Sequence, residues 1–165
     1  MSLGPKADAL RRKVLSRLPM TLWMWKTLPL AAFAGLRVAR LDEASCVVRL
    51  PGGWRTQNPF RSTYFAAQAM AAEMSTGAPA LVLLADAPAS VAMLVVGLEA
   101  RYSKKAVGET AFTFEDVASM RTAIAEASAD TEPRTFIART VGRDSSGDEV
   151  AAFEIAWSFK RRSAG

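Results

Sequence analysis

The sequence contains no histidine and one cysteine, Cys46, in 165 residues. Without histidine, Ser-His-Asp and Cys-His catalysis are excluded, and the usual zinc and iron ligand sets are missing. A single cysteine cannot form an intramolecular disulfide. We therefore expect a cytoplasmic protein without a metal or another cofactor, whose chemistry depends on carboxylates, amides, hydroxyls, lysine or arginine.

A long uninterrupted hydrophobic run is also missing. Residues 18–36 are apolar and aromatic, but Lys26 and two prolines interrupt them, so the ~20 apolar residues of a membrane span are not reached. The start, MSLGPKADALRRKVLSR, carries charges where a signal peptide needs an apolar core. We interpret the segment as a helix that packs Trp23 and Trp25 on the body. A surface anchor that dips into a bilayer is the alternative, but membrane contact is not our expectation.

Acidic residues are fewer than basic ones, 16 against 21, which gives a net charge of +5. The excess gathers near the two ends of the chain, at Arg11, Arg12, Lys13, Arg17, Lys160, Arg161 and Arg162. Such clusters are typical of solvated ends, and less often contact anionic lipid, phosphate-bearing cofactors or nucleic acid. No zinc-finger spacing or aromatic RNA-binding motif accompanies them, so no nucleic-acid partner is expected.

The composition is that of one globular domain. With 165 residues and 50% hydrophobic content, the chain can bury one sizeable core. We expect a single domain over residues 1–165, in which residues 1–34 form an N-terminal helical extension. Within it, residues 6–28 suit two short helices broken at Pro19, followed by a small-residue loop that ends at Gly35.

The rest of the chain alternates between strand and helix patterns. Residues 36–50 suit a strand or hairpin, which PGGW ends. A helix follows from about Ser62, a suitable N-cap, to Gly77, a suitable C′ residue, with Pro79 just beyond. Residues 117–129 are Ala-rich and favour a second long helix.

Four further strands are expected. Alternation over residues 92–103 indicates a strand whose one face is fully buried, formed by Leu94, Val96, Leu98, Ala100 and Tyr102. Phe112 and Phe114 mark its expected partner after a turn at residues 107–109. Residues 134–143 and 149–161 flank the turn DSSGD, and the second presents Ala151, Phe153, Ile155, Trp157 and Phe159 on one face. This order favours an α+β fold in which an antiparallel sheet curls around the helix of residues 62–77.

One carboxylate stands out on that helix. Glu73 lies among alanines and methionines, and apolar residues occupy most of the circumference, so the helix is expected to be buried on nearly all sides. No Lys or Arg lies three or four positions away to neutralise the charge. Glu73 could still pair with an arginine from another strand or lie at an exposed end. The third possibility is a carboxylate beside a cleft, with a raised proton affinity, used as a base or nucleophile.

The interval from Asn58, in the loop before the helix, to Glu73 resembles that of the hotdog-fold acyl-CoA thioesterases. In the branch related to phenylacetate-pathway and human acyl-CoA thioesterases, a loop Asn or Gln precedes a mid-helix Asp or Glu by the same interval. The text QNPFRSTYFAAQAMAAEMSTG is even more similar to an uncharacterised branch known only as a domain of unknown function. The resemblance extends from about Pro19 to Phe159 and rests on element order as well as this interval.

The resemblance implies roles for four residues. Glu73 would be the general base or nucleophile, and Asn58 would position the attacking water or the substrate carbonyl. The related enzymes carry a His-Gly pair at the start of the helix, where the Gly amide forms the oxyanion hole. Here Tyr64 and Phe65 occupy those positions. The backbone N–H of Phe65 is still available at the positive helix end, although the bulky side chains could crowd a thioester.

Helix geometry implies an assembly. Phe65 and Glu73 are eight residues apart, which at ~1.5 Å per residue is about 12 Å along the axis. One thioester carbonyl cannot reach both within one chain, because each group must approach the reacting atoms to ~3 Å. We therefore expect at least a homodimer, or a tetramer. The resemblance to hotdog proteins implies that the subunits join edge to edge through the strand at residues 92–103.

Basic and polar residues near the helix start could hold the substrate's carrier. The candidates for contacting coenzyme A phosphates are Arg61, Ser62, Lys104 and Lys105, although an exposed lysine pair is more often a solubilising feature. The leading hypothesis is a thioesterase acting on an acyl-CoA or acyl-carrier-protein thioester. The alternative is a non-catalytic hotdog protein that binds a fatty-acyl or similar apolar ligand. The dehydratases of this fold are set aside, because they resemble one another in an Asp-His pair that this chain cannot make.

Overall fold

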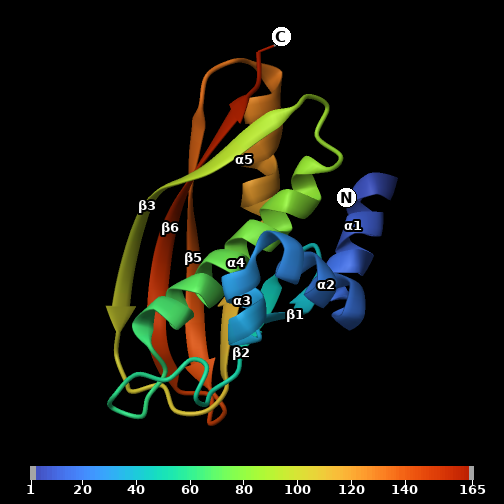
Figure 1. The fold of residues 1–165 in the computed structure, drawn as a ribbon. Coiled ribbons are helices and arrows are strands. Elements are labelled where there is room, and N and C mark those ends of the chain that lie inside the picture. Colours follow the sequence, from blue (N-terminus) through green and yellow to red (C-terminus); the bar gives the residue numbers. More distant parts are fainter. Residues whose placement is uncertain (1–2, 164–165) are drawn as a thin grey trace.

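A six-stranded antiparallel sheet wraps around one long helix (Figure 1). The computed structural model describes residues 3–163, so the predicted domain's ends, residues 1–2 and 164–165, lie outside the described residues. The helices are α1 (Pro5–Leu15), α2 (Arg17–Thr27), α3 (Pro29–Ala34), α4 (Phe65–Leu84) and α5 (Val117–Ala129). The strands are β1 (Arg37–Leu41), β2 (Cys46–Leu50), β3 (Val91–Tyr102), β4 (Thr110–Phe114), β5 (Arg134–Asp144) and β6 (Glu149–Arg161).

The strands follow the order β1-β2-β4-β5-β6-β3, and every neighbouring pair is antiparallel. Alternate side chains of β6 are buried against the helical layer, as expected, among them Phe153, Ile155 and Phe159. Together with α4, which is buried along most of its length, they form the core. This arrangement is the hotdog fold, and the α+β prediction is confirmed.

The central helix is longer than expected. The prediction that it ends at Gly77 is wrong, because α4 continues through Pro79 to Leu84. Pro79 removes one backbone hydrogen bond, but the turn beyond it buries Val82 and Leu83 in the core. Burial of such side chains stabilises by about 1.5–3 kcal/mol each, which is enough to offset the missing bond. At the other end, the N-cap is Tyr64 and not Ser62.

The N-terminal segment is helical almost throughout. Its helices break at Ser16, so the predicted break at Pro19 is wrong. Pro19 lies in the first turn of α2, where backbone N–H groups make no hydrogen bond within the helix, and proline is therefore tolerated there. The small-residue segment expected as a loop is α3, which ends at Gly35 in a left-handed conformation (φ 78°). In Figure 1 these helices lie beside α4 and the β1–β2 end of the sheet, and α1 contacts both α4 and β1.

Strand β3 differs from its prediction in two ways. Its partner is β6, whereas β4, which contains Phe112 and Phe114, pairs with β2 and β5. The face expected to be fully buried is open: Leu94 is 65% exposed and Leu98 49%. A bulge between Val95 and Gly97 shifts the alternation. As the last strand in the order, β3 also leaves one edge without a partner strand within the described chain.

Candidate functional site

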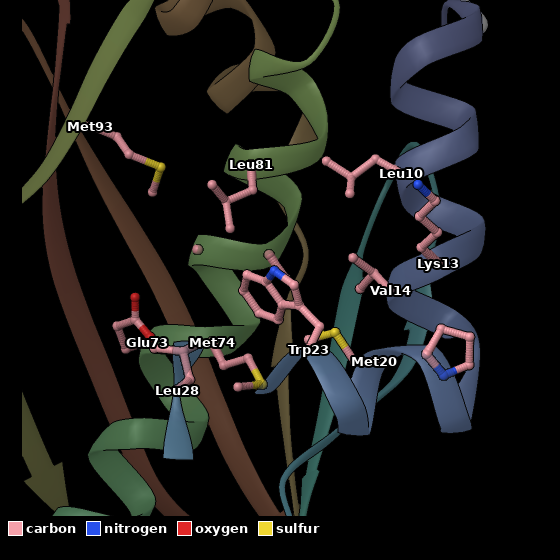
Figure 2. Close-up of a pocket in the computed structure, with 13 residues that line it drawn as sticks. Leu10, Lys13, Val14, Met20, Trp23, Leu28, Glu73, Met74, Leu81 and Met93 are labelled. Carbon is pink, nitrogen blue, oxygen red and sulfur yellow. The ribbon is translucent and has the colours of Figure 1, made fainter. Parts of the chain in front are cut away.

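Glu73 lies beside an apolar pocket of about 270 Å³ (Figure 2). The third turn of α4 carries it, and the helices α1 and α2 and strand β3 complete the walls. The lining residues are Leu10, Lys13, Val14, Pro19, Met20, Trp23, Leu28, Glu73, Met74, Gly77, Ala78, Leu81 and Met93. Only two of these side chains carry a charge, so the pocket excludes strongly solvated groups.

The Glu73 carboxylate has no hydrogen-bond or ion-pair partner in residues 3–163. Burial therefore raises its pKa above the ordinary value of 4.5, because the charged form loses hydration that nothing replaces. Of the possibilities open from the sequence, the arginine pair is excluded within the described chain. A carboxylate of this kind is a stronger base than a solvated one.

Neighbouring groups hold the turn around Glu73 in place. The Trp157 indole N–H donates to Thr76 Oγ1 (2.9 Å), and the Thr76 hydroxyl donates to the Glu73 backbone carbonyl (3.0 Å). Gly77 leaves the space that the carboxylate occupies, since a Cβ there would lie 2.9 Å from Glu73 Oε1 and 3.4 Å from the Trp157 ring. The carboxylate is thus fitted between a glycine and an anchored helix turn.

A second, more open cleft of about 580 Å³ lies at the start of α4. It brings together six of the eight residues singled out in the sequence, namely Asn58, Ser62, Tyr64, Phe65, Lys104 and Lys105. Arg61 is exposed but does not line this cleft. Glu73 does not line it either, and the two cavities share no lining residue.

Asn58 shapes the loop that forms one side of this cleft. Its Oδ1 accepts hydrogen bonds from the Phe60 N–H (2.9 Å), the Ser62 N–H (3.2 Å) and the Ser62 hydroxyl (3.2 Å). These bonds hold a tight turn in which Arg61 has a positive φ of 57°. The Asn58 side-chain NH₂ makes no hydrogen bond within the described residues, so it remains free to donate.

The first N–H of α4 is also available. Tyr64 is the N-cap, and no side chain caps the helix, so the Phe65 N–H makes no hydrogen bond in the part of the chain that is described. It lies at the positive end of a 20-residue helix. The Phe65 ring stacks edge-on against Tyr64 and Tyr102, at centroid distances of 4.8 and 6.3 Å. All three aromatic residues of this cluster line the cleft.

The two lysines of the cleft differ in their surroundings. Lys104 Nζ is ion-paired with Asp144 (2.9 Å) and Asp148 (2.6 Å), which fastens it to the β5–β6 turn and raises its pKa. Lys105 is exposed and has no ion-pair partner among residues 3–163. Its charge is therefore available to an anion, whereas that of Lys104 is already neutralised.

Sequence reasoning missed two residues of this cleft. Gln68 is buried, and its Nε2 donates to the Thr63 carbonyl (3.4 Å), but its Oε1 has no partner among the described residues. A buried acceptor without a donor is costly, and this one belongs to a residue that lines the cleft. Tyr102 is the other. The i, i+4 spacing of Gln68 from Tyr64 was the available signal, since it places Gln68 one turn above the helix start.

Among the described residues, no group of three or more Asp, Glu, Cys or His side chains could hold a metal ion. Cys46 is buried, which raises the pKa of its thiol to about 12, so it supplies no thiolate nucleophile near neutral pH. Within residues 3–163, no helix is long and apolar enough to cross a bilayer. The reactive groups of the two cavities are thus one carboxylate, amide groups, tyrosines and lysines.

The fold, an antiparallel sheet wrapped around a long helix, defines a protein of the hotdog class. Residues 19–159 match the family model described as "Domain of unknown function (DUF4442)". The chain belongs to this family, which corresponds to the uncharacterised branch that the motif around Asn58 and Glu73 resembles. No curated protein matches the chain.

Several solved structures have the same fold. A Pseudomonas aeruginosa protein of unknown function, described as a probable thioesterase, is 18% identical with a TM-score of 0.69, covering 94% of this chain and 95% of its own. A protein of unknown function from Chlorobaculum tepidum is 11% identical with a TM-score of 0.77, covering 95% and 98%. A thioesterase from Haemophilus influenzae is 10% identical with a TM-score of 0.65, covering 92% and 95%. At these identities the likeness establishes the fold.

Proposed function

We propose that the protein is a thioesterase that hydrolyses an acyl-CoA or acyl-carrier-protein thioester in the cytoplasm, with Glu73 as general base or nucleophile. The observation that carries the proposal is the Glu73 carboxylate itself, which borders an apolar pocket, has no ion-pair partner among the described residues and has a raised pKa. Stability alone does not favour such a group, because a buried carboxylate without a partner costs free energy. The thioesterase descriptions of two structural neighbours agree with this assignment.

In the proposed reaction, ionised Glu73 takes a proton from water while the water oxygen bonds to the thioester carbonyl carbon. The Asn58 NH₂ orients the water or the carbonyl. The carbonyl oxygen becomes an oxyanion, which the Phe65 N–H stabilises at the positive end of α4. The C–S bond then breaks, and the proton passes from Glu73 to the departing thiolate. As a nucleophile, Glu73 would instead form an acyl anhydride that water opens.

The proposal requires a homodimer, because Glu73 and the Phe65 N–H belong to separate cavities of one chain. The free edge of β3 supports it. This 12-residue strand carries the exposed side chains Leu94, Val96 and Leu98 beside its unpaired edge, a combination that favours pairing with a second strand. If two β3 edges pair about a two-fold axis, the two α4 helices run antiparallel, and the Phe65 end of one approaches Glu73 of the other. A tetramer would be two such dimers.

The cleft at the start of α4 suits the polar carrier of the thioester. Gln68 Oε1 is an unpartnered acceptor for an amide N–H, a group that the pantetheine arm of coenzyme A and of acyl carriers contains. Lys105 is placed to meet a phosphate, and Arg61 could do so from the exposed loop. We give Lys104 and Ser62 positioning roles, since their polar atoms are bonded to Asp144, Asp148 and Asn58.

The test is turnover of an acyl-CoA panel from acetyl to palmitoyl, measured by release of free thiol. Glu73→Gln preserves the size of the side chain and removes the base, so we expect kcat to fall by about 10²–10⁴-fold while the melting curve stays cooperative. Glu126→Gln, on the exposed part of α5 and outside both cavities, is the matched control and should retain wild-type turnover. Equal turnover by wild type and Glu73→Gln would remove Glu73 from the reaction.

A second candidate function is binding without catalysis. It is favoured by the Tyr64 and Phe65 rings, which line the cleft at the positions where the related enzymes have His-Gly. In that case, calorimetry would detect binding of an acyl ligand, and no member of the panel would release thiol. Thiol release that depends on Glu73 would exclude this candidate.

A further inference from the structure

We infer that the N-terminal helices α1 and α2 form an acyl-chain pocket that takes an unbranched hydrocarbon chain of about ten carbons. This inference rests on the proposed function, which supplies the class of ligand, an acyl thioester. It deepens that function by naming the acyl chain that the pocket beside Glu73 would hold, apart from the cleft at the start of α4.

The first argument is the position of the pocket relative to Glu73. A thioester carbonyl held beside this carboxylate has its acyl chain next to the apolar walls, since Glu73 and Leu81 line the same cavity from one face of α4 (Figure 2). The opposite walls come from Leu10 and Val14 of α1 and from Trp23 of α2. The chain therefore has an apolar space to enter as soon as its carbonyl reaches Glu73.

The second argument is chemical. Apart from Glu73 and Lys13, the lining is made of hydrocarbon, thioether and indole groups and the backbone of Gly77. Among these uncharged groups, the Trp23 indole N–H is the one side-chain donor and no side chain offers a strong acceptor, so most positions along the chain would leave a hydroxyl or amide without a partner, which is strongly disfavoured. The pocket thus selects an unsubstituted chain. Each methylene moved from water into it should strengthen binding roughly fourfold.

The third argument is size. A cavity of about 150 Å³ lined by apolar side chains holds a benzene molecule, which has six carbons. By the same proportion, the cavity of about 270 Å³ beside Glu73 holds about ten carbons. Longer chains would have to leave the pocket or displace its walls.

The fourth argument concerns α1. This helix ends at Leu15, before residue 19 where the match to the family begins, yet it supplies Leu10, Lys13 and Val14 to the pocket. It is tied to the body at its start, where the N–H groups of Lys6 and Ala7 donate to the Asp86 carboxylate (3.2 and 3.0 Å). Because α1 lies outside the region that matches the family, the limit that it sets on acyl-chain length is a property of this chain and not of the matched region.

The test measures binding of non-hydrolysable S-alkyl-CoA thioethers by calorimetry, with S-ethyl, S-decyl and S-hexadecyl chains. Leu10→Trp places a large ring in the pocket, so S-decyl-CoA should bind at least about tenfold more weakly and S-ethyl-CoA unchanged. The matched control is Leu18→Trp, on the exposed face of α2 outside this pocket, which should bind both as wild type does. A wild-type affinity that does not increase from the ethyl to the decyl chain would overturn the inference, as would equal binding by Leu10→Trp.

A second pair of variants keeps the test valid if Leu10→Trp does not fold. Trp23→Ala enlarges the pocket and should shift the preferred chain toward hexadecyl. Trp25→Ala, two residues along and outside this pocket, should leave the preference unchanged. Turnover of the matching acyl-CoA esters separates the two proposals. Binding that follows this pattern without turnover refutes only the thioesterase function, whereas turnover with a chain-length profile unaffected by either pocket variant refutes only the acyl pocket.

Discussion

At the scale of the residue, the carboxylate of Glu73 is partly buried and has no ion-pair partner in the described chain. Burial raises the pKa of its carboxyl above 4.5, and no cation of the described chain opposes this shift. A raised pKa means that folded protein keeps the proton to a higher pH than the free side chain does. The form able to act as a base therefore disappears as the pH falls through this raised value.

This sign gives a prediction for the pH dependence of activity. The value of kcat/KM should rise with pH through the Glu73 pKa, at a pH above 4.5, and then level off. Rates of thiol release between pH 4.5 and 8.5 measure the profile, and circular dichroism at each pH controls for unfolding. A profile without any acidic limb over this range would show that no carboxylate of raised pKa takes part.

The fit of Gly77 against Glu73 leads to a second prediction. Gly77→Ala places a methyl group 2.9 Å from Glu73 Oε1, so the carboxylate must move. A displacement of about 1 Å can cost up to 10²-fold in rate, so we expect kcat to fall about 10- to 100-fold. The control is Gly97→Ala in β3, where the new Cβ meets only Ala156 at an ordinary 3.6 Å. Unchanged kcat in Gly77→Ala would contradict a reacting position for this oxygen.

At the scale of the element, β3 is the strand that the protomer leaves incomplete. In the proposed dimer, the β3 edges of two subunits pair with each other. Leu98→Lys places a charge at this edge, so we predict that the protein becomes monomeric and loses activity. Sedimentation velocity measures the mass and thiol release the activity. The control is Ile137→Lys, at an exposed apolar position on β5, which should have the same mass and the same activity as the wild-type protein. A monomeric Leu98→Lys variant with full activity would contradict the need for a dimer.

Sequence patterns predicted most elements because their signals are local. The hairpin of β5 and β6 follows from the DSSGD turn and the buried alternation of β6, and α5 follows from its alanine content. The end of α4 could not be predicted locally, since its continuation past Pro79 depends on the burial of Val82 and Leu83 in the core, which a local pattern does not reveal. The bulge in β3 likewise has no local signature, yet it reverses which side chains face inward.

The candidate site was predictable to a similar extent. Glu73 stands out in the sequence because it is a charged residue in an apolar helix, and Asn58 because it lies in the loop just before that helix. Gln68 was missed, because only the three-dimensional structure reveals that its Oε1 lacks a donor. The different states of Lys104 and Lys105 depend on Asp144 and Asp148, which lie some 40 residues along the chain.

At the scale of the whole molecule, the cleft with Asn58 and the pocket with Glu73 are separate in one protomer. The proposed function joins them across a two-fold axis, so each active site would take Glu73 from one subunit and Asn58 from its partner. This arrangement predicts the activity of dimers that contain two different variants. Two subunits that are inactive alone can together form one complete site.

The most direct test of this account is therefore the activity of mixed dimers of Glu73→Gln and Asn58→Asp subunits. Asn58→Asp keeps the oxygen that holds the loop and removes the NH₂ donor. Each variant alone should be inactive. After unfolding and refolding together in equal amounts, half of the dimers are mixed with one intact site of two, so about a quarter of wild-type thiol release should return. If both groups act within one chain, the mixture should remain as inactive as its components.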